Sequence, residues 1–195
     1  DYDMLFLSSI ISGGLGLLFG SAVRVPRKVT SFKQLDGKKV SVLTGTTAVQ
    51  ILRRFAATHD IKFQTVMAKD QYEAFLLLES GRVDAFVLDD NMLAGVIAQS
   101  KNPEGYKIVG EVIGAEPIAI QFSKSDPAIK KAVDDVIRHM MSNGDLEQLY
   151  HKWYMQPIPP KNMNLNLPMG ETLRKMIASP NDVPVEQFES VRQTR

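Results

Sequence analysis

The feature that most constrains the fold is an alternation of short apolar runs and amphipathic segments between residues 39 and 113. The runs are rich in β-branched residues and predict strands; they are KVSVL (39–43), IKFQTVM (61–67), VDAFVL (83–88) and YKIVGEVI (106–113). Between them, apolar residues recur at the spacing of one helical face. Strands that alternate with helices of about ten residues predict βαβ units. The fold class is therefore α/β, with a doubly wound, mostly parallel sheet.

The region after residue 116 predicts one more strand, IAIQF (118–122), and then helices. Asp126-Pro127 is typical of a helix start, and the helix to Met141 is expected to bury its apolar face: Ile129, Val133, Val136, Ile137 and Met140. Further helices are expected at 146–154 and 171–178. The prolines of PIPPKNMNLNLP (157–168) exclude regular structure between those two helices.

The N-terminal segment Met4–Val23 is 20 residues long and contains no charge. That length reaches the minimum for a membrane span, but its glycines and serines make it a poor helix. A signal peptide would carry its positive charge before the apolar part rather than after it, as Arg24 does here. A buried apolar segment, a membrane anchor and a truncated or rearranged chain start all remain open.

Composition narrows the function classes. The chain has 23 Lys+Arg against 22 Asp+Glu and no basic tail, so nothing favours a nucleic-acid partner. It has no cysteine, which excludes disulfides and thiol chemistry. The three histidines have no metal-ligand spacing, so we expect neither a metal nor a cofactor. No phosphate-binding glycine motif occurs.

The stretch VLTGTTAVQ (42–50) resembles a strand that passes through a glycine turn into a helix. Such a turn offers backbone N–H groups and the positive end of a helix, which suits an anion. The alternative is an ordinary helix cap, because Thr47 with Gln50 three residues later forms a capping-box pattern.

Asp90 indicates which kind of ligand the turn would bind. It follows the strand 83–88, so it is expected at the same sheet edge as the turn. A carboxylate there repels a phosphate and attracts an ammonium group. Turn and carboxylate together predict a site for a zwitterion; the alternative is that Asp90 caps the helix 91–100. Asp89 and Asp90 are poorly placed to cooperate as catalytic acids or metal ligands, so no catalytic residue is assigned.

Three separated motifs resemble the periplasmic amino-acid-binding proteins of ABC importers, in particular the glutamate/aspartate-binding branch. They are SFKQLDGKKVSVLTGTTA, LLLESGRVDAFVLDDNMLAG and HKWYMQPIPPKNMNLN. The resemblance covers about residues 31 to 182. It implies a type II solute-binding fold, in which an amino acid binds between two lobes, a periplasmic location and delivery to a membrane permease.

The resemblance also implies roles for individual residues. Thr47 corresponds to the residue that holds the ligand α-carboxylate, and Thr44 and Thr46 line the same turn. Asp90 corresponds to the carboxylate that takes the α-ammonium group. Gln71 stands where glutamate/aspartate binders place a histidine near the ligand side chain, which weakens the expectation of an acidic ligand.

The expected domain organisation is an N-terminal apolar segment (1–19), an α/β ligand-binding lobe with two crossover strands (20–122), and C-terminal helices and a tail (123–195) that return to a truncated first lobe. Only about 20 residues stand where the family has most of its first lobe. Two alternatives to a transport function follow. One is a truncated remnant that forms a homo-oligomer or a domain swap through exposed apolar residues: Leu5, Phe6, Ile10, Leu17 and Phe19. The other is an enzyme of the cyclohexadienyl dehydratase type.

Overall fold

The computed structural model of the 195-residue chain describes residues 17–24, 31–109 and 125–180, together with residues 113, 115, 116, 120, 122 and 123. The chain divides into two compact units. The α/β unit comprises Leu18–Ala115 and Lys161–Leu165, and the helical unit holds the remaining residues.

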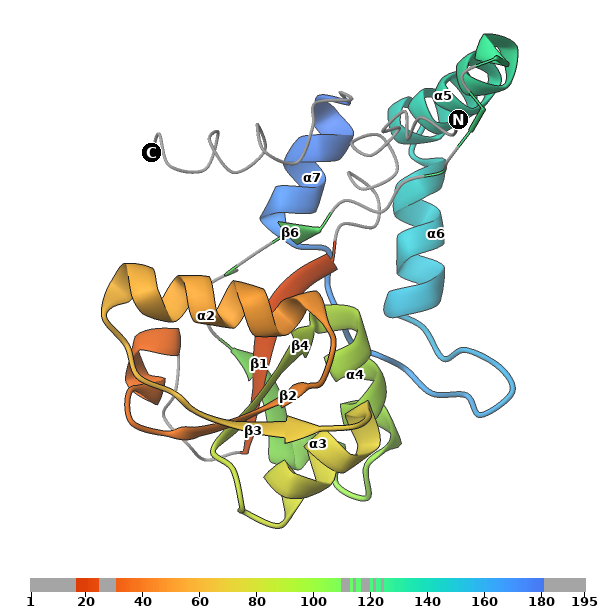
Figure 1. Cartoon of the computed structure of the whole chain (residues 1–195). Coiled ribbons are helices and arrows are strands. Elements are labelled where there is room, and N and C mark those ends of the chain that lie inside the picture. The colour runs from red at the N-terminus through yellow and green to blue at the C-terminus, as the bar shows by residue number, and fades with distance from the viewer. Residues whose placement is uncertain are drawn as a thin grey trace. The chain divides into compact units, whose positions relative to one another are not determined.

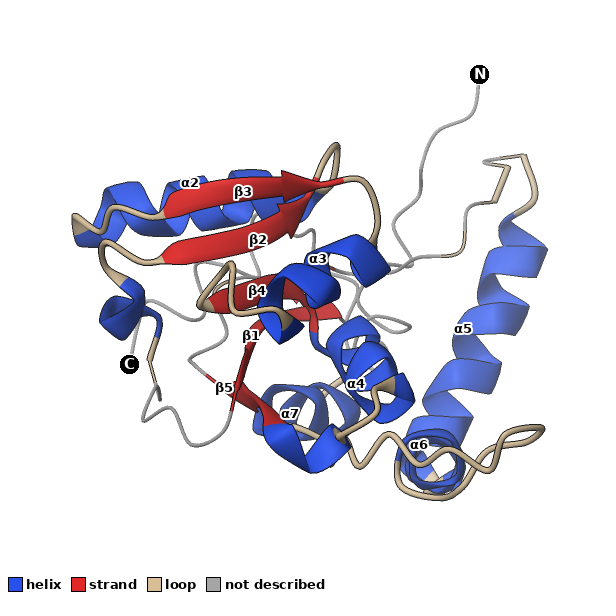
Figure 2. Cartoon of the chain, turned by 90° about the horizontal axis from the view of Figure 1, so that it is seen from below, coloured by secondary structure: helices blue, strands red, loops and turns tan. Residues whose placement is uncertain are grey.

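The α/β unit is built on an open sheet with the strand order β3-β2-β4-β1-β5 (Figure 2), and β6 pairs with β1. The strands β2, β3 and β4 are parallel to one another, whereas β1 is antiparallel to both β4 and β5. The α/β class predicted from the sequence is therefore confirmed, with one inserted antiparallel strand. The strands are β1 (Leu17–Arg24), β2 (Lys39–Leu43), β3 (Gln64–Ala68), β4 (Ala85–Asp89), β5 (Tyr106–Val109) and β6 (Ala115–Glu116).

Strand β1 comes from the uncharged N-terminal segment. Its residue Ala22 pairs with Phe86 on one side and with Ile108 on the other, so the strand lies within the sheet. Pairing on both sides outweighs the low strand propensity of its glycine and serine. The family resemblance implied a crossover strand at the start of the lobe, from residue 20, and β1 begins three residues earlier. The rest of the segment, residues 4–16, lies outside the described residues. Among the residues that are described, no helix is long and apolar enough to cross a membrane.

Helices cover both faces of the sheet (Figure 1). On one face α2 (Thr47–His59) packs with the even-numbered residues Val40 and Val42 of β2. On the other face α3 (Gln71–Glu79) and α4 (Asp90–Gln99) enclose a second apolar cluster that includes Leu43 and Phe86. The alternation follows from the two-residue period of a strand.

Short 3-10 turns complete the α/β unit. They are η1 (Phe32–Leu35), which buries two apolar residues beneath α2, and η2 (Pro103–Gly105), which leads into β5. A buried hydroxyl also ties β2 to α3, because Ser41 Oγ donates to the carbonyl of Ala74 at 3.2 Å.

The helical unit contains α5 (Pro127–Ser142), α6 (Asp145–Tyr154) and α7 (Glu171–Ala178). Helix α5 begins as predicted, because Asp126 Oδ1 accepts from the Ile129 amide at 3.1 Å. The predicted burial of its apolar face is wrong for two residues: Ile129 is 48% and Val136 58% exposed. The buried apolar cluster of this unit consists of Met141, Leu173 and Ile177. Most of the predicted strand 118–122 lies outside the described residues.

Candidate functional site

The predicted site residues follow three neighbouring strands. Leu43 at the end of β2 pairs with Ala68 at the end of β3. Between β2 and β4, Ser41 pairs with Phe86, and the same register sets Leu43 against Leu88. The three parallel strands thus end at one level. The turn at residues 44–46, Gln71 and Asp90 all lie directly beyond that edge.

This edge is also the point where the connections diverge. The chain leaving β2 enters α2 on one face of the sheet, whereas the chain leaving β4 enters α4 on the opposite face. Such a switch point opens a crevice beyond the carboxyl ends of the strands, and this is where α/β proteins bind ligands. The turn after β2 and Asp90 follow the two strands that border this switch point.

The turn after β2 is held by backbone and hydroxyl bonds. The Thr44 amide donates to the carbonyl of Ala68 on β3 at 2.9 Å, and Thr46 Oγ1 donates to the carbonyl of Leu43 at 3.0 Å. Gly45 has φ +77°, a left-handed conformation that favours glycine. These contacts fix where the first turn of α2 begins.

The helix α2 begins differently from the capping pattern read in the sequence. Its N-cap is Thr46, whose side chain makes no capping hydrogen bond. The predicted Thr47–Gln50 capping box is therefore wrong, since Thr47 is already the first helical residue. Its side chain is exposed. The first turn of α2 contains no acidic residue, so its amides and its positive helix end have no neighbouring carboxylate on the same turn.

The helix α3 begins in the opposite way. Its N-cap Asp70 accepts from the amides of Tyr72 and Glu73 at 3.0 and 2.9 Å. Glu73 in turn accepts from the Lys69 amide at 2.9 Å. The N-terminus of α3 thus has its own carboxylates, and Gln71 lies half-buried in its first turn. Of the two helix starts beside β2, α2 is the one suited to an external anion.

Asp90 is the first residue of α4, one position earlier than the sequence placed the helix. Its Oδ1 accepts from the Asn91 amide at 2.7 Å, and the residue is partly exposed. The preceding Asp89 is buried at the end of β4. The two carboxylates therefore lie in different environments, one buried at the end of a strand and one partly exposed at the start of a helix.

The sequence predicted the residues at this edge but missed the bonds that shape it. The Thr44–Ala68 and Thr46–Leu43 bonds join positions with no recognisable sequence signal. Within the described residues no group of three or more His, Asp or Glu side chains could hold a metal ion.

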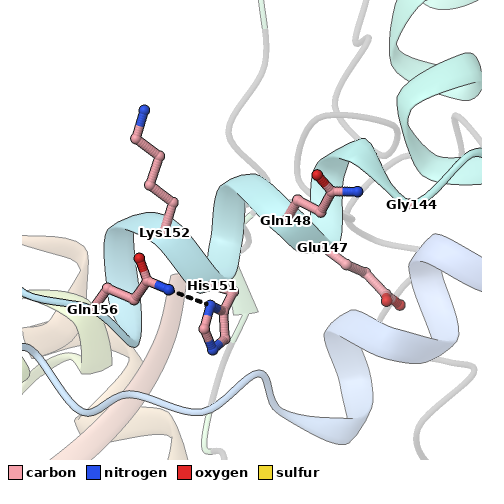
Figure 3. Close-up of a pocket in the computed structure, with 6 residues that line it drawn as sticks. All are labelled: Gly144, Glu147, Gln148, His151, Lys152 and Gln156. Atoms are coloured by element: carbon pink, nitrogen blue, oxygen red, sulfur yellow. Dashed lines mark hydrogen bonds between the residues drawn. The ribbon is translucent and has the colours of Figure 1, made fainter.

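A separate hollow runs along α6 in the helical unit (Figure 3). It is lined by Gly144, Glu147, Gln148, His151, Lys152 and Gln156. Gln156 Nε2 lies 3.3 Å from His151 Nδ1 at one end of it (Figure 3). The lining comes from four exposed residues of α6 and from Gly144 and Gln156, which flank the helix, and it contains none of the predicted site residues.

The chain was compared with protein families and with proteins of known function. No family model matches the chain. The L-glutamate/L-aspartate-binding protein of Pseudomonas aeruginosa is 40% identical over 160 residues, which is 82% of this chain and 53% of that protein. The glutamate/aspartate import solute-binding protein of Salmonella typhimurium is 36% identical over 154 residues, 79% of this chain and 51% of that protein.

Solved structures of amino-acid-binding proteins have a similar fold. An ancestral arginine-binding protein bound to arginine has a TM-score of 0.53 and 30% identity, covering 72% of this chain and 62% of that chain. The chain spans about half the length of the curated relatives it matches. It is thus a homologue of the glutamate/aspartate-binding solute-binding proteins along that half, as the three sequence motifs predicted.

Proposed function

We propose that the chain binds a free polar or acidic amino acid in the periplasm and passes it unchanged to the membrane permease of an ABC importer. The names of its homologues, which are binding proteins rather than enzymes, support this function. The chain covers only about half of those proteins, so the proposal concerns the half-site that the α/β unit carries.

The observation that carries the proposal is the pairing of opposite charges at the carboxyl edge. The N-terminus of α2 has no acidic residue in its first turn, and Asp90 follows the neighbouring strand β4. Adjacent strands lie about 4.8 Å apart, which is the scale of an amino-acid headgroup. One wall therefore offers a place for an α-carboxylate and a place for an α-ammonium group.

The residues then have distinct roles. The first-turn amides of α2 and the exposed hydroxyl of Thr47 bind the α-carboxylate, because both are hydrogen-bond donors. Asp90 accepts from the α-ammonium group. Thr44 and Thr46 position the turn. The Thr46 hydroxyl already donates to the carbonyl of Leu43, so it acts on the turn rather than on the ligand.

The affinity of this half-site is expected to be low. A charge-assisted hydrogen bond contributes about 1.5–3 kcal/mol, and two such contacts give roughly the 4 kcal/mol of a millimolar complex. The family resemblance implies a site between two lobes, so the contacts of one wall alone are expected to bind weakly. A micromolar dissociation constant for a proven monomer would contradict this account of a half-site.

The experiment is ligand-observed NMR with glutamate, aspartate, glutamine and asparagine at millimolar concentration. We expect saturation transfer to at least one of them, and its loss in Asp90→Asn. The matched control is Asp60→Asn, which removes the same charge at the opposite end of α2. Asp60 has φ 52°, a conformation that asparagine tolerates. Binding by none of the four, or equal binding by Asp90→Asn, would contradict the proposal.

A second candidate function is self-association, which exposed apolar side chains of the helical unit favour. Ile129, Val136, Leu149 and Trp153 are each at least 40% exposed, and exposed apolar patches mark interaction surfaces. Of the residues first named for this role, Leu5, Phe6 and Ile10 lie outside the described residues, while Leu17 and Phe19 are part of β1.

Light scattering after size exclusion tests this second function. A dimer or larger species of the wild type that becomes monomeric in Val136→Ser/Trp153→Ser supports it. A wild-type mass of 21.7 kDa at every concentration would contradict it.

A further inference from the structure

Gln71 lies beside the headgroup site but is separate from it. It opens α3, which follows β3 at the same sheet edge. The turn after β2 contacts this strand end directly, because the Thr44 amide donates to the Ala68 carbonyl at 2.9 Å. A ligand whose α-carboxylate binds at the start of α2 therefore has its side chain within reach of Gln71.

The side-chain amide of Gln71 is available to a ligand. The residue is half-buried, and no hydrogen bond of its amide is found within the described part of the chain. A primary amide both donates and accepts. It can exchange two hydrogen bonds with another amide, whereas a carboxylate can only accept from it and leaves its carbonyl oxygen facing a negative charge.

The charges around Gln71 oppose a second carboxylate. Asp70 and Glu73 flank it, and their carboxylates already bind the amides of Tyr72, Glu73 and Lys69 at the start of α3. The α3 N-terminus is thus unavailable to a ligand anion, in contrast to that of α2. The one cationic side chain in this stretch, Lys69, is exposed to solvent, where its charge is strongly screened.

We infer that Gln71 makes this half of the site select an amino acid with a neutral amide side chain over one with a carboxylate side chain. The inference rests on the proposed function and narrows its ligand class. It sets this chain apart from the relatives named for glutamate and aspartate.

The test compares glutamine with glutamate, which differ only in amide against carboxylate. Both are titrated into the ¹⁵N-labelled full chain, and their dissociation constants are read from amide shifts near the turn. We expect glutamate to bind about tenfold more weakly than glutamine, the effect of one unpaired buried polar group. In Gln71→Lys the order should reverse, because the ammonium group pairs with the ligand side-chain carboxylate.

The matched control is Gln99→Lys, which adds the same charge at the far end of α4, where Gln99 Nε2 donates to the Gly95 carbonyl. It should leave the ratio unchanged. Equal or tighter binding of glutamate by the wild type would overturn this inference alone. The same ratio in Gln71→Lys as in the wild type would also overturn it. Failure of every amino acid to bind would overturn the proposed function and this inference together.

Discussion

The two units of this chain differ in how far the apolar faces of their amphipathic helices are buried. In the α/β unit, α2 buries Ala48, Val49, Leu52 and Phe55 against the sheet. In the helical unit, α5 has an equally regular apolar stripe, yet its buried residues are Asp134 and Met141, and α6 has none. A stripe shows that a helix has an apolar side but does not supply the surface that buries it.

The two units therefore differ in the size of their buried apolar core. The sheet of the α/β unit gives α2, α3 and α4 a surface on both faces, and its two clusters contain the largest fully buried side chains. The α5–α7 cluster contains three buried residues. The proposed ligand edge therefore lies in the unit with the larger buried core, and the exposed apolar residues proposed for self-association lie in the helical unit.

Truncating one apolar residue in each unit should show the largest contrast. Phe86 is fully buried in β4, so Phe86→Ala is expected to lower the free energy of unfolding by about 3–5 kcal/mol. Val136→Ala, on the exposed face of α5, should change it by less than about 0.5 kcal/mol. Urea denaturation followed by circular dichroism measures both. A loss for Val136→Ala that approaches that of Phe86→Ala would break the comparison.

Two adjacent aspartates of α5 give the next largest contrast. Asp134 is buried and lies 2.6 Å from Lys130 Nζ, whereas Asp135 forms an exposed pair with Lys131. We expect Asp134→Ala to cost about 2 kcal/mol, because it removes a buried, charged acceptor that lies 2.6 Å from the partly buried Lys130 ammonium. Asp135→Ala should cost about 0.5 kcal/mol or less. Thermal unfolding of both variants tests this, and equal losses would be inconsistent with the burial of Asp134.

Removing a helix cap should lower the free energy of unfolding by a similar amount in the two units. Asp70 caps α3 and Asp126 caps α5, each by accepting from first-turn amides. Because capping is local, Asp70→Ala and Asp126→Ala should each cost about 1 kcal/mol. A much larger loss for Asp70→Ala would mean that its carboxylate also supports the sheet edge.

The smallest expected effect is spectroscopic. Trp153 is the one tryptophan of the chain and is 47% exposed. We expect acrylamide to quench its fluorescence nearly as well in the native chain as in urea. Strong protection in the native state would show that the exposed face of α6 is covered in solution.

The sequence predicted the α/β unit well because its strands and helices are local and strongly patterned. The βαβ order, the helix start at Asp126 and the position of Asp90 beyond β4 all follow from short stretches of chain. It failed where the outcome depends on distant partners. The pairing of β1 with β4 and β5 has no signal within the strand itself. The burial of Ile129 and Val136 was predicted wrongly, because an apolar stripe does not show whether another surface covers it.

The candidate site shows the same limit. Its residue types could be selected from the sequence, since threonine at a glycine turn and aspartate after a strand have recognisable chemistry. The shape of the turn could not, because it depends on the Thr44 amide reaching β3 and on Thr46 bonding back to Leu43. The N-cap at Thr46 instead of Thr47 is the consequence.

The most direct test of the central claim is an amide chemical-shift map of the ¹⁵N-labelled chain titrated with glutamine. The account predicts the largest shifts at Gly45, Thr46, Thr47 and Ala48, with smaller shifts near Asp90, and none along α5 and α6. Shifts confined to the hollow along α6, or no shifts at the start of α2, would contradict the claim that this edge binds the amino-acid headgroup.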